Sequence, residues 1–133
     1  MKKIGTLNTR LSRLIAGMGH MDRLVICDCG LPIPNGKTVV DLALTKNIPR
    51  FIDTLRVVLE ELQVEEYVVA EEMEARSAHV LEDVKALLPD VSGKAVPHEE
   101  FKRMLCENQN TAFVRTGEAT PYANVMLISG VTF

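Results

Sequence analysis

Two ionisable residues flank a short apolar run in the segment GHMDRLVICDCGLPIP, residues 19–34. His20 precedes the run and Asp28 follows it. A histidine changes charge near neutral pH and can give or take a proton, and a carboxylate accepts hydrogen bonds from hydroxyl groups. The two residues are therefore candidates for contact with a polar ligand. A structural role, in which His20 caps a helix end and Asp28 hydrogen-bonds a turn, is the alternative.

The apolar run between these residues, at 24–27, is typical of a short buried strand. Because a strand rises about 3.3 Å per residue, His20 and Asp28 would lie roughly 15 to 20 Å apart at its two ends. The carboxyl ends of strands in α/β sheets face the crevice where ligands bind, which favours Asp28 as a binding residue. One chain brings both residues to one small ligand only if it bends, or if a neighbouring subunit supplies one of them.

Two further clusters contain polar groups suited to a hydroxylated ligand. His98 follows Pro97 at the start of a predicted helix, where the positive end of the helix dipole favours a neutral imidazole. A neutral ring donates one hydrogen bond and accepts another. The segment TPYAN adds the phenol of Tyr122 and the amide of Asn124, next to Pro121. A packed turn aromatic is the alternative role for Tyr122.

The glycines of GMGHMD, residues 17–22, do not predict a dinucleotide site. They follow a predicted helix and precede a predicted strand, whereas a phosphate-binding turn follows a strand and opens a helix. The chain has 15 basic and 18 acidic side chains and a formal net charge of -3. It contains no basic block or basic stripe with interleaved aromatic residues, so we expect no nucleic-acid partner.

Metal binding and nucleophilic catalysis are the weaker hypotheses for the opening segment. His20, Asp22, Asp28 and a cysteine are all possible ligand types, but their spacing matches no known metal motif, and we expect no metal site. Cys27 and Cys29 lie beside an aliphatic strand, where cysteine is more often a small buried hydrophobe than a nucleophile.

The cellular location is predicted from the N-terminus, the apolar runs and the cysteines. The N-terminus has no long apolar region with a cleavage site, and no run approaches the roughly 20 apolar residues of a membrane span. We therefore expect a cytoplasmic protein with no membrane contact. The three cysteines form no CxxC pair, and their odd number argues against a disulfide framework.

The elements that must position these residues are predicted from apolar spacing and turn formers. Helices are expected at residues 8–18, 49–63, 77–88 and 97–107, and strands at 24–27, 38–44, 65–70, 112–114 and 125–128. This alternation predicts a single α/β domain over residues 1–133, a sandwich with a mostly parallel central sheet and helices on both faces. With no Trp and few other aromatic residues the core must be aliphatic, and part of that apolar surface suits an oligomer.

The motifs together resemble the family of ribose pyranases and fucose mutarotases. The resemblance runs nearly end to end, through GMGHMD, CDCGLPIP, DLALTKNIPRF, the YVVAEE strand end, PHEEFK and RTGEATPYANVMLISGVTF. Motifs this long, in order and at matching spacing, are far more specific than a lone glycine fingerprint. Two positions differ from the family pattern: Cys29 stands where alanine is expected, and the connection between Leu88 and Val96 is short.

The resemblance implies an activity and roles for individual residues. It implies interconversion of the pyranose and furanose forms of D-ribose, before the sugar is phosphorylated, without a cofactor. His20 corresponds to the catalytic acid, and Asp28 and His98 to sugar-binding residues. Tyr122, Ala123 and Asn124 correspond to the substrate-binding loop.

The resemblance also implies an assembly that removes the distance problem. The family's pyranases form decamers of two stacked five-membered rings, with sites between subunits, so a neighbour's His20 could reach Asp28. Two alternatives stay open at this point. One is a fucose-type mutarotase that inverts the anomeric centre, and the other is a sugar-binding module without catalysis.

Overall fold

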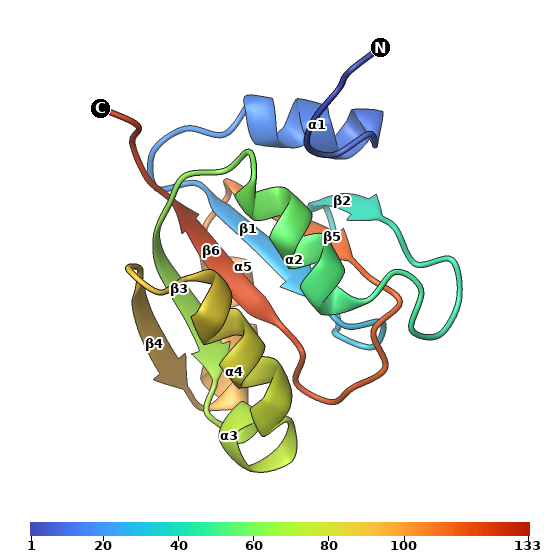
Figure 1. Ribbon diagram of the computed structural model, residues 1–133. Coiled ribbons are helices and arrows are strands. Elements are labelled where there is room, and N and C mark those ends of the chain that lie inside the picture. Colours follow the sequence, from blue (N-terminus) through green and yellow to red (C-terminus); the bar gives the residue numbers. More distant parts are fainter.

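Six strands form one sheet in the order β2-β5-β1-β6-β3-β4 (Figure 1). The computed structural model describes all residues, 1–133. The strands are β1 Arg23–Cys27, β2 Thr38–Asp41, β3 Val64–Ala70, β4 Ser92–Val96, β5 Thr111–Arg115 and β6 Val125–Ser129. Only β6 runs antiparallel to its neighbours, β1 and β3, and the other pairings are parallel. The predicted mostly parallel sheet is therefore confirmed.

Helices cover both faces of this sheet (Figure 1). They are α1 Thr9–Ala16, α2 Phe51–Leu59, α3 Glu72–Arg76, α4 Ala78–Leu87 and α5 His98–Glu107. Alternate residues of β1 divide between two apolar cores, as the period of a strand requires. Leu24 and Ile26 pack in the larger core, with buried residues of α1, α2 and α4. Val25 and Cys27 pack in a smaller core, with residues of α5.

The start of α1 follows the sequence prediction closely. The side chain of Asn8 accepts a hydrogen bond from the backbone N–H of Leu11 at 2.9 Å, and Gly17 ends the helix. This is the N-cap geometry that satisfies an otherwise unpaired N–H in the first turn. The buried residues of the helix are Leu11 and Ile15, so only one face of α1 packs in the core.

One local prediction is wrong, and the sequence prediction omits two elements. Pro49 does not lie in the first turn of α2, because it precedes the N-cap residue Arg50, and the helix begins at Phe51. The sequence reading has no β4, because this edge strand is mostly exposed and lacks an apolar run. It also lacks α3, a five-residue helix with a single buried side chain, Met73. In particular, the connection between Leu88 and Val96 is not merely a short loop, since it contains β4.

The topology places two groups of residues at opposite ends of the strands. The carboxyl ends of the parallel strands form one edge of the sheet in this sense, and their amino ends form the other. Asp28 follows β1, and His98 follows β4, so both lie at the edge where the parallel strands end. Asn124 precedes the antiparallel β6 and therefore reaches the same edge. His20 precedes β1 at the other edge.

None of the helices has the length and apolar character that crossing a bilayer requires.

Candidate active site

Asp28 and Asn124 are joined by two hydrogen bonds where β1 ends and β6 begins. The backbone N–H of Asp28 donates to Oδ1 of Asn124 at 2.9 Å, and Nδ2 of Asn124 donates to Oδ2 of Asp28 at 3.0 Å. The other carboxylate oxygen of Asp28 accepts from the backbone N–H of Gly30 at 2.9 Å. Asp28 therefore also orders the turn after β1, which was the alternative prediction for it. Asn124 is buried whereas Asp28 is half-buried, so the pair is fixed from inside and reachable from outside.

His98 and Tyr122 form the aromatic side of the same edge. Their rings meet edge to face, with centroids 5.0 Å apart, and the His98 ring is stacked at 6.4 Å on Phe101. Tyr122 has a positive φ of 61°, and the next residue, Ala123, is fully buried. This turn directs the phenol ring towards His98 while Ala123 anchors the loop in the core. The Nδ1 atom of His98 is buried and has no hydrogen-bond partner in the chain.

Glu72 fixes the backbone at the start of α5. Its two carboxylate oxygens accept from the backbone N–H of His98, at 2.9 and 3.1 Å. Hydrogen bonds from its own backbone N–H and from that of His98 hold the pKa of Glu72 below its ordinary value of 4.5. The first-turn N–H groups of a helix have no partner within the helix, and an acidic group there is favourable. Glu72 thereby links α3 to the residue that carries the imidazole.

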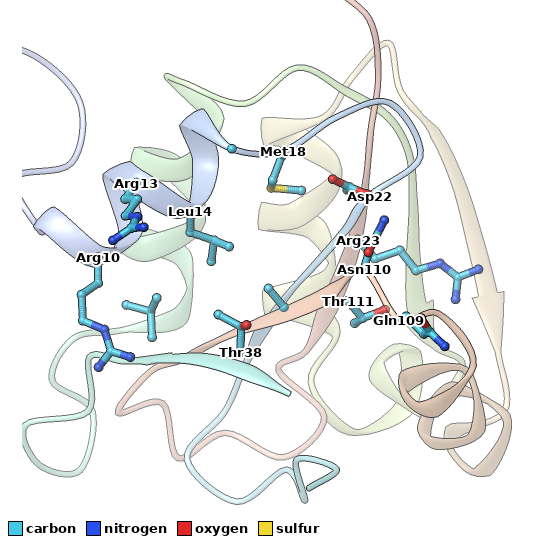
Figure 2. A pocket seen from close by; sticks show the side chains of 13 residues that line it. Arg10, Arg13, Leu14, Met18, Asp22, Arg23, Thr38, Gln109, Asn110 and Thr111 are labelled. Carbon is cyan, nitrogen blue, oxygen red and sulfur yellow. The ribbon is translucent and has the colours of Figure 1, made fainter. Parts of the chain in front are cut away.

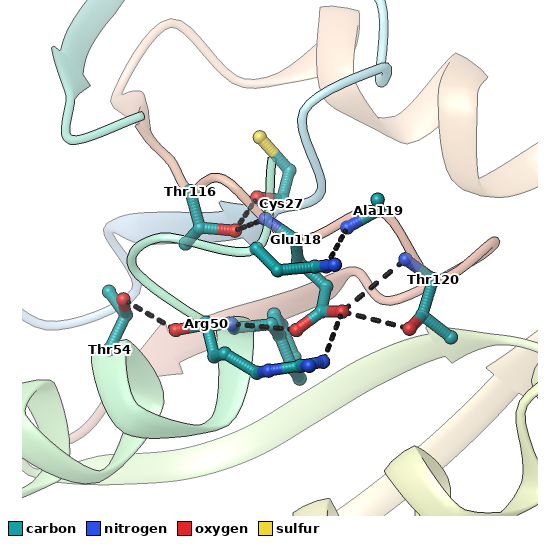
Figure 3. A network of polar contacts seen from close by, with 9 residues as sticks. Cys27, Arg50, Thr54, Thr116, Glu118, Ala119 and Thr120 are labelled. Atoms are coloured by element: carbon teal, nitrogen blue, oxygen red, sulfur yellow. Dashed lines mark hydrogen bonds and ion pairs between the residues drawn. The ribbon is translucent and has the colours of Figure 1, made fainter. Parts of the chain in front are cut away.

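A buried carboxylate, Glu118, organises the loop between β5 and the Tyr122 turn (Figure 3). It accepts hydrogen bonds from the backbone N–H of Phe51 at 3.1 Å and from the hydroxyl of Thr120 at 2.8 Å, and it pairs with Arg50 at 3.4 Å. Burial acts to raise the pKa of Glu118, but the hydrogen bonds from Thr120 and Phe51 and the charge of Arg50 outweigh it. The pKa is lowered as a result.

The same loop holds the chain on either side of Asp28. The carbonyl of Cys27 accepts from the backbone N–H and the hydroxyl of Thr116, at 3.0 and 2.8 Å (Figure 3). The backbone N–H of Cys29 donates to the carbonyl of Glu118 at 2.9 Å. Arg115 donates to the carbonyl of Cys29 at 3.1 Å. These contacts explain how a carboxylate after a short strand can have a fixed position.

His20 lies at the opposite edge and pairs with a residue that the sequence reading did not select. Its Nε2 atom is 3.0 Å from Oε2 of Glu65, the second residue of β3. The side chains of His20 and Glu65 are 51% and 38% exposed, so the pair faces outward. His20 and Asp28 thus lie at the two ends of β1, and one chain does not bring them together.

Cys27 and Asp22 take structural positions. Cys27 is buried, and burial together with the nearby charge of Asp28 raises the pKa of its thiol to about 12. A thiol with this pKa is protonated at neutral pH and is a poor nucleophile. Asp22 accepts from the backbone N–H of Gly19 at 2.8 Å and so closes the turn before β1. The chain does not gather His20, Asp22 and Asp28 into a metal-ligand group.

Of the six predicted site residues, the structure therefore brings four together, buries Ala123 in the core and leaves His20 apart. Asp28, His98, Tyr122 and Asn124 lie at one edge, where carboxylate, imidazole, phenol and amide groups offer both donors and acceptors. Sequence reasoning missed Glu65, Glu72 and Glu118. The signal for Glu72 was its place at the end of the YVVAEE strand, whereas Glu118 had no such signal, because the segment RTGEATPYAN around it is mostly polar.

Known proteins resemble this chain over its whole length. The RbsD / FucU transport protein family matches residues 1–132. The chain is 53% identical to the D-ribose pyranase of Geobacillus thermodenitrificans, over 100% of this chain and 99% of that protein. It is 52% identical to the D-ribose pyranase of Coprothermobacter proteolyticus, with 100% of both chains covered.

Solved structures of related proteins have the same fold. The structure of Bacillus subtilis RbsD complexed with D-ribose superposes with a TM-score of 0.94, at 41% identity and with 100% of both chains covered. A fucose mutarotase from Streptococcus pneumoniae, solved with L-fucose, has a TM-score of 0.75 at 20% identity, again with 100% of both chains covered. The second likeness concerns the fold alone. Because the family matches residues 1–132 and two relatives are 53% and 52% identical over the whole chain, this chain belongs to the RbsD / FucU transport protein family.

Proposed function

We propose that this chain is a D-ribose pyranase, an isomerase that interconverts the β-pyranose and β-furanose forms of ribose. The observation that carries the proposal is the identity of about half of all residues, over the full length, to proteins named D-ribose pyranase. The cluster of Asp28, Asn124, His98 and Tyr122 supports it, because these side chains offer donors and acceptors of the kind that hold a sugar.

The chemistry needs only proton transfer and positioning. The ring oxygen of the pyranose takes up a proton while the anomeric hydroxyl loses one, and the bond between ring oxygen and anomeric carbon breaks. The resulting aldehyde is attacked by another hydroxyl, which closes the five-membered ring. His20 gives its proton to the ring oxygen, and the anomeric hydroxyl gives its proton to water. On closure the attacking hydroxyl returns a proton to His20, and the aldehyde oxygen takes one from water. Asp28, His98, Tyr122 and Asn124 orient the open chain so that the correct hydroxyl meets the aldehyde.

The site is completed by a neighbouring subunit. Because His20 and Asp28 lie at opposite ends of β1, the histidine that serves one sugar comes from the next chain. The assembly is a decamer of two stacked pentameric rings. Exposed apolar side chains support an assembly, since Met21 beside His20 is 55% exposed and Leu44 is 81% exposed. We place the protein in the cytoplasm, where its three free thiols stay reduced.

Two other activities are less well supported. A fucose-type mutarotase would share the fold, but the solved fucose mutarotase is 20% identical, whereas the relatives named D-ribose pyranase are near 50%. A sugar-binding module without catalysis would suit a histidine that is buried and neutralised by its partner. The His20 side chain is instead 51% exposed.

Proton NMR saturation transfer tests the proposed activity. Irradiating the pyranose anomeric signals of D-ribose should reduce the furanose signals more strongly with protein than without it. L-Fucose is measured in parallel, and transfer between its anomers should rise less. Faster exchange for L-fucose alone would favour the mutarotase, and no acceleration for either sugar in a folded, oligomeric sample would favour the binding module.

A further inference from the structure

A cavity lies between α1 and the strands β2 and β5, and none of its lining residues belongs to the proposed ribose site. Its volume is about 690 Å³, which is within the range of about 300 to 1,000 Å³ typical of small-molecule sites. It opens on the β5 side of β1, whereas the His20–Glu65 pair lies on the β6 and β3 side. Neither Asp28 nor Asn124 lines it. Nothing in the proposed reaction uses this cavity.

Arginines without a carboxylate partner are concentrated around the cavity. The chain has eight arginines, and Arg50, Arg56, Arg103 and Arg115 form ion pairs with acidic side chains. Of the four that form none, three line this cavity, namely Arg10, Arg13 and Arg23. The fourth, Arg76, lies in α3. Most of the uncompensated guanidinium charge of the chain therefore surrounds one hollow.

Arg10 and Arg13 are the pair placed to hold an anion. They are one turn apart on α1, so their Cβ atoms are about 5 to 6 Å from each other. Figure 2 shows both at the same end of the cavity. Arg10 donates one hydrogen bond, to the carbonyl of Val39 at 3.3 Å, and Arg13 donates none. The guanidinium of Arg23 is directed to the carbonyl of Met104 at 3.3 Å and is not part of this pair.

The rest of the cavity offers neutral polar groups. Figure 2 shows Gln109, Asn110 and Thr111 at the end opposite the arginine pair, with Thr38 between. The hydroxyl of Thr111 is buried and has no hydrogen-bond partner in the chain, which is costly unless a ligand or water satisfies it. The side chains of Thr38, Gln109 and Asn110 make no hydrogen bond within the chain either. Hydroxyl and amide groups of this kind bind the hydroxyls of a polyol.

The only acidic residue of the cavity does not oppose this arrangement. Asp22 already accepts a hydrogen bond from the backbone of Gly19 at 2.8 Å, and it lies with Arg23 rather than with the α1 pair. The charge of the lining is +2, from three arginines and one aspartate. Adjacent guanidinium groups bind phosphate through charge-assisted hydrogen bonds.

We infer that this cavity binds a small phosphorylated polyol, with its phosphate on Arg10 and Arg13 and its hydroxyls on Thr38, Thr111, Gln109 and Asn110. The cavity shares no lining residue with the proposed ribose site, so the inference does not depend on pyranase activity. Inorganic phosphate alone would fill only the arginine end.

Isothermal titration calorimetry of the intact oligomer tests the inference, with glycerol 3-phosphate, inorganic phosphate and glycerol as probes. Glycerol 3-phosphate should bind more tightly than inorganic phosphate, and glycerol should not bind. The double variant Arg10→Ala/Arg13→Ala should weaken binding about tenfold or more. Arg76→Ala removes an arginine that also lacks a carboxylate partner, and it should change affinity less than about twofold. Saturating D-ribose should leave the affinity unchanged.

Several results would overturn the inference. These are no binding of glycerol 3-phosphate at low salt, equal affinity for inorganic phosphate, or displacement by D-ribose. Equal loss in the double variant and in Arg76→Ala would mean a general charge effect. If the double variant misfolds, Arg13→Gln is measured instead, since Arg13 makes no hydrogen bond that the fold needs, and unchanged affinity in that variant would also contradict the site.

Discussion

The Asn124 side chain holds Asp28 by both its backbone and its carboxylate, through one accepted and one donated hydrogen bond of 2.9 and 3.0 Å. An amide can do this because its oxygen accepts and its nitrogen donates. No other side chain of similar size offers both groups in this geometry. The carboxylate proposed to bind ribose is therefore positioned by the residue that precedes β6.

Replacing Asn124 by Asp should keep the hydrogen bond to the Asp28 backbone and remove the hydrogen bond to the Asp28 carboxylate. The new carboxylate can still accept from the backbone of Asp28, but it repels the Asp28 carboxylate instead of donating to it. We expect a loss of about 1–3 kcal/mol in the free energy of unfolding, together with loss of ribose binding. Urea unfolding and calorimetry measure both. Asn35→Asp, in an exposed loop, is the matched control and should change neither; normal ribose binding by Asn124→Asp would contradict the role of Asn124.

Replacing Glu72 by Ala should weaken ribose binding without removing the reaction. The carboxylate is the hydrogen-bond partner of the His98 backbone, so its loss frees the start of α5 and the imidazole that it carries. We expect a higher KM for ribose, by several-fold, and a kcat near that of the unmodified protein. Glu71→Ala removes the neighbouring exposed carboxylate and serves as the control. A fall in kcat with KM unchanged would argue against this positioning role.

Replacing Glu65 by Ala should reduce turnover and spare binding. Glu65 is the partner of the His20 ring in the chain, and a ring without it samples other orientations. We expect kcat to fall about ten- to a hundredfold while KM stays within a few-fold. The adjacent Glu66, which pairs with Lys94 at 3.1 Å, provides the control variant Glu66→Ala. Equal kcat values in the two variants would mean that the His20–Glu65 contact has no part in the reaction.

Glu118→Gln should change how stability depends on pH. The pKa of Glu118 is lower in the folded chain than its ordinary value of 4.5, so the ionised form contributes stability above that value. This contribution is lost as the pH falls below 4.5 through the folded pKa. We expect the variant to be less stable at pH 7 by about 1–3 kcal/mol, with a smaller difference in acid.

Urea unfolding of both proteins between pH 7 and pH 3 measures this difference. Comparing the two curves isolates Glu118 from other carboxylates whose pKa values are also lowered, such as Glu61 and Glu100. Glu60→Gln, at an exposed position, is the control. A stability difference that stays constant over this pH range would show that the charge of Glu118 has no role.

Much of the fold could be predicted because its strongest signals are local. The Asn8 cap and the apolar spacing of α1 are visible in consecutive residues, as are the buried runs of β1 and β6. The edge strand β4 could not be predicted, because an exposed strand has no apolar run and is defined by its pairing with β3. For the same reason the short helix α3 has little sequence signature.

The candidate site also has a part that the sequence predicts and a part that it does not. Asp28 could be placed from its position after a strand, and Asn124 from its turn motif. Their direct contact joins residues 96 positions apart and has no local signal. The partners Glu65 and Glu72 are ordinary surface-type residues in the sequence, and only the folded chain shows which backbone or ring each one contacts. Their roles therefore depend on long-range geometry.

Complementation between inactive chains is the most direct test of the proposed shared site. His20→Ala and Asn124→Ala are each produced alone, and then co-expressed so that both enter the same oligomers, and ribose ring exchange is measured by saturation transfer. Each variant alone should give the uncatalysed rate. In random mixed rings about a quarter of the interfaces combine an intact His20 with an intact Asn124, so about a quarter of the activity should return. Mixed oligomers that stay inactive, or full activity of His20→Ala alone, would contradict ring interconversion at a site shared between subunits.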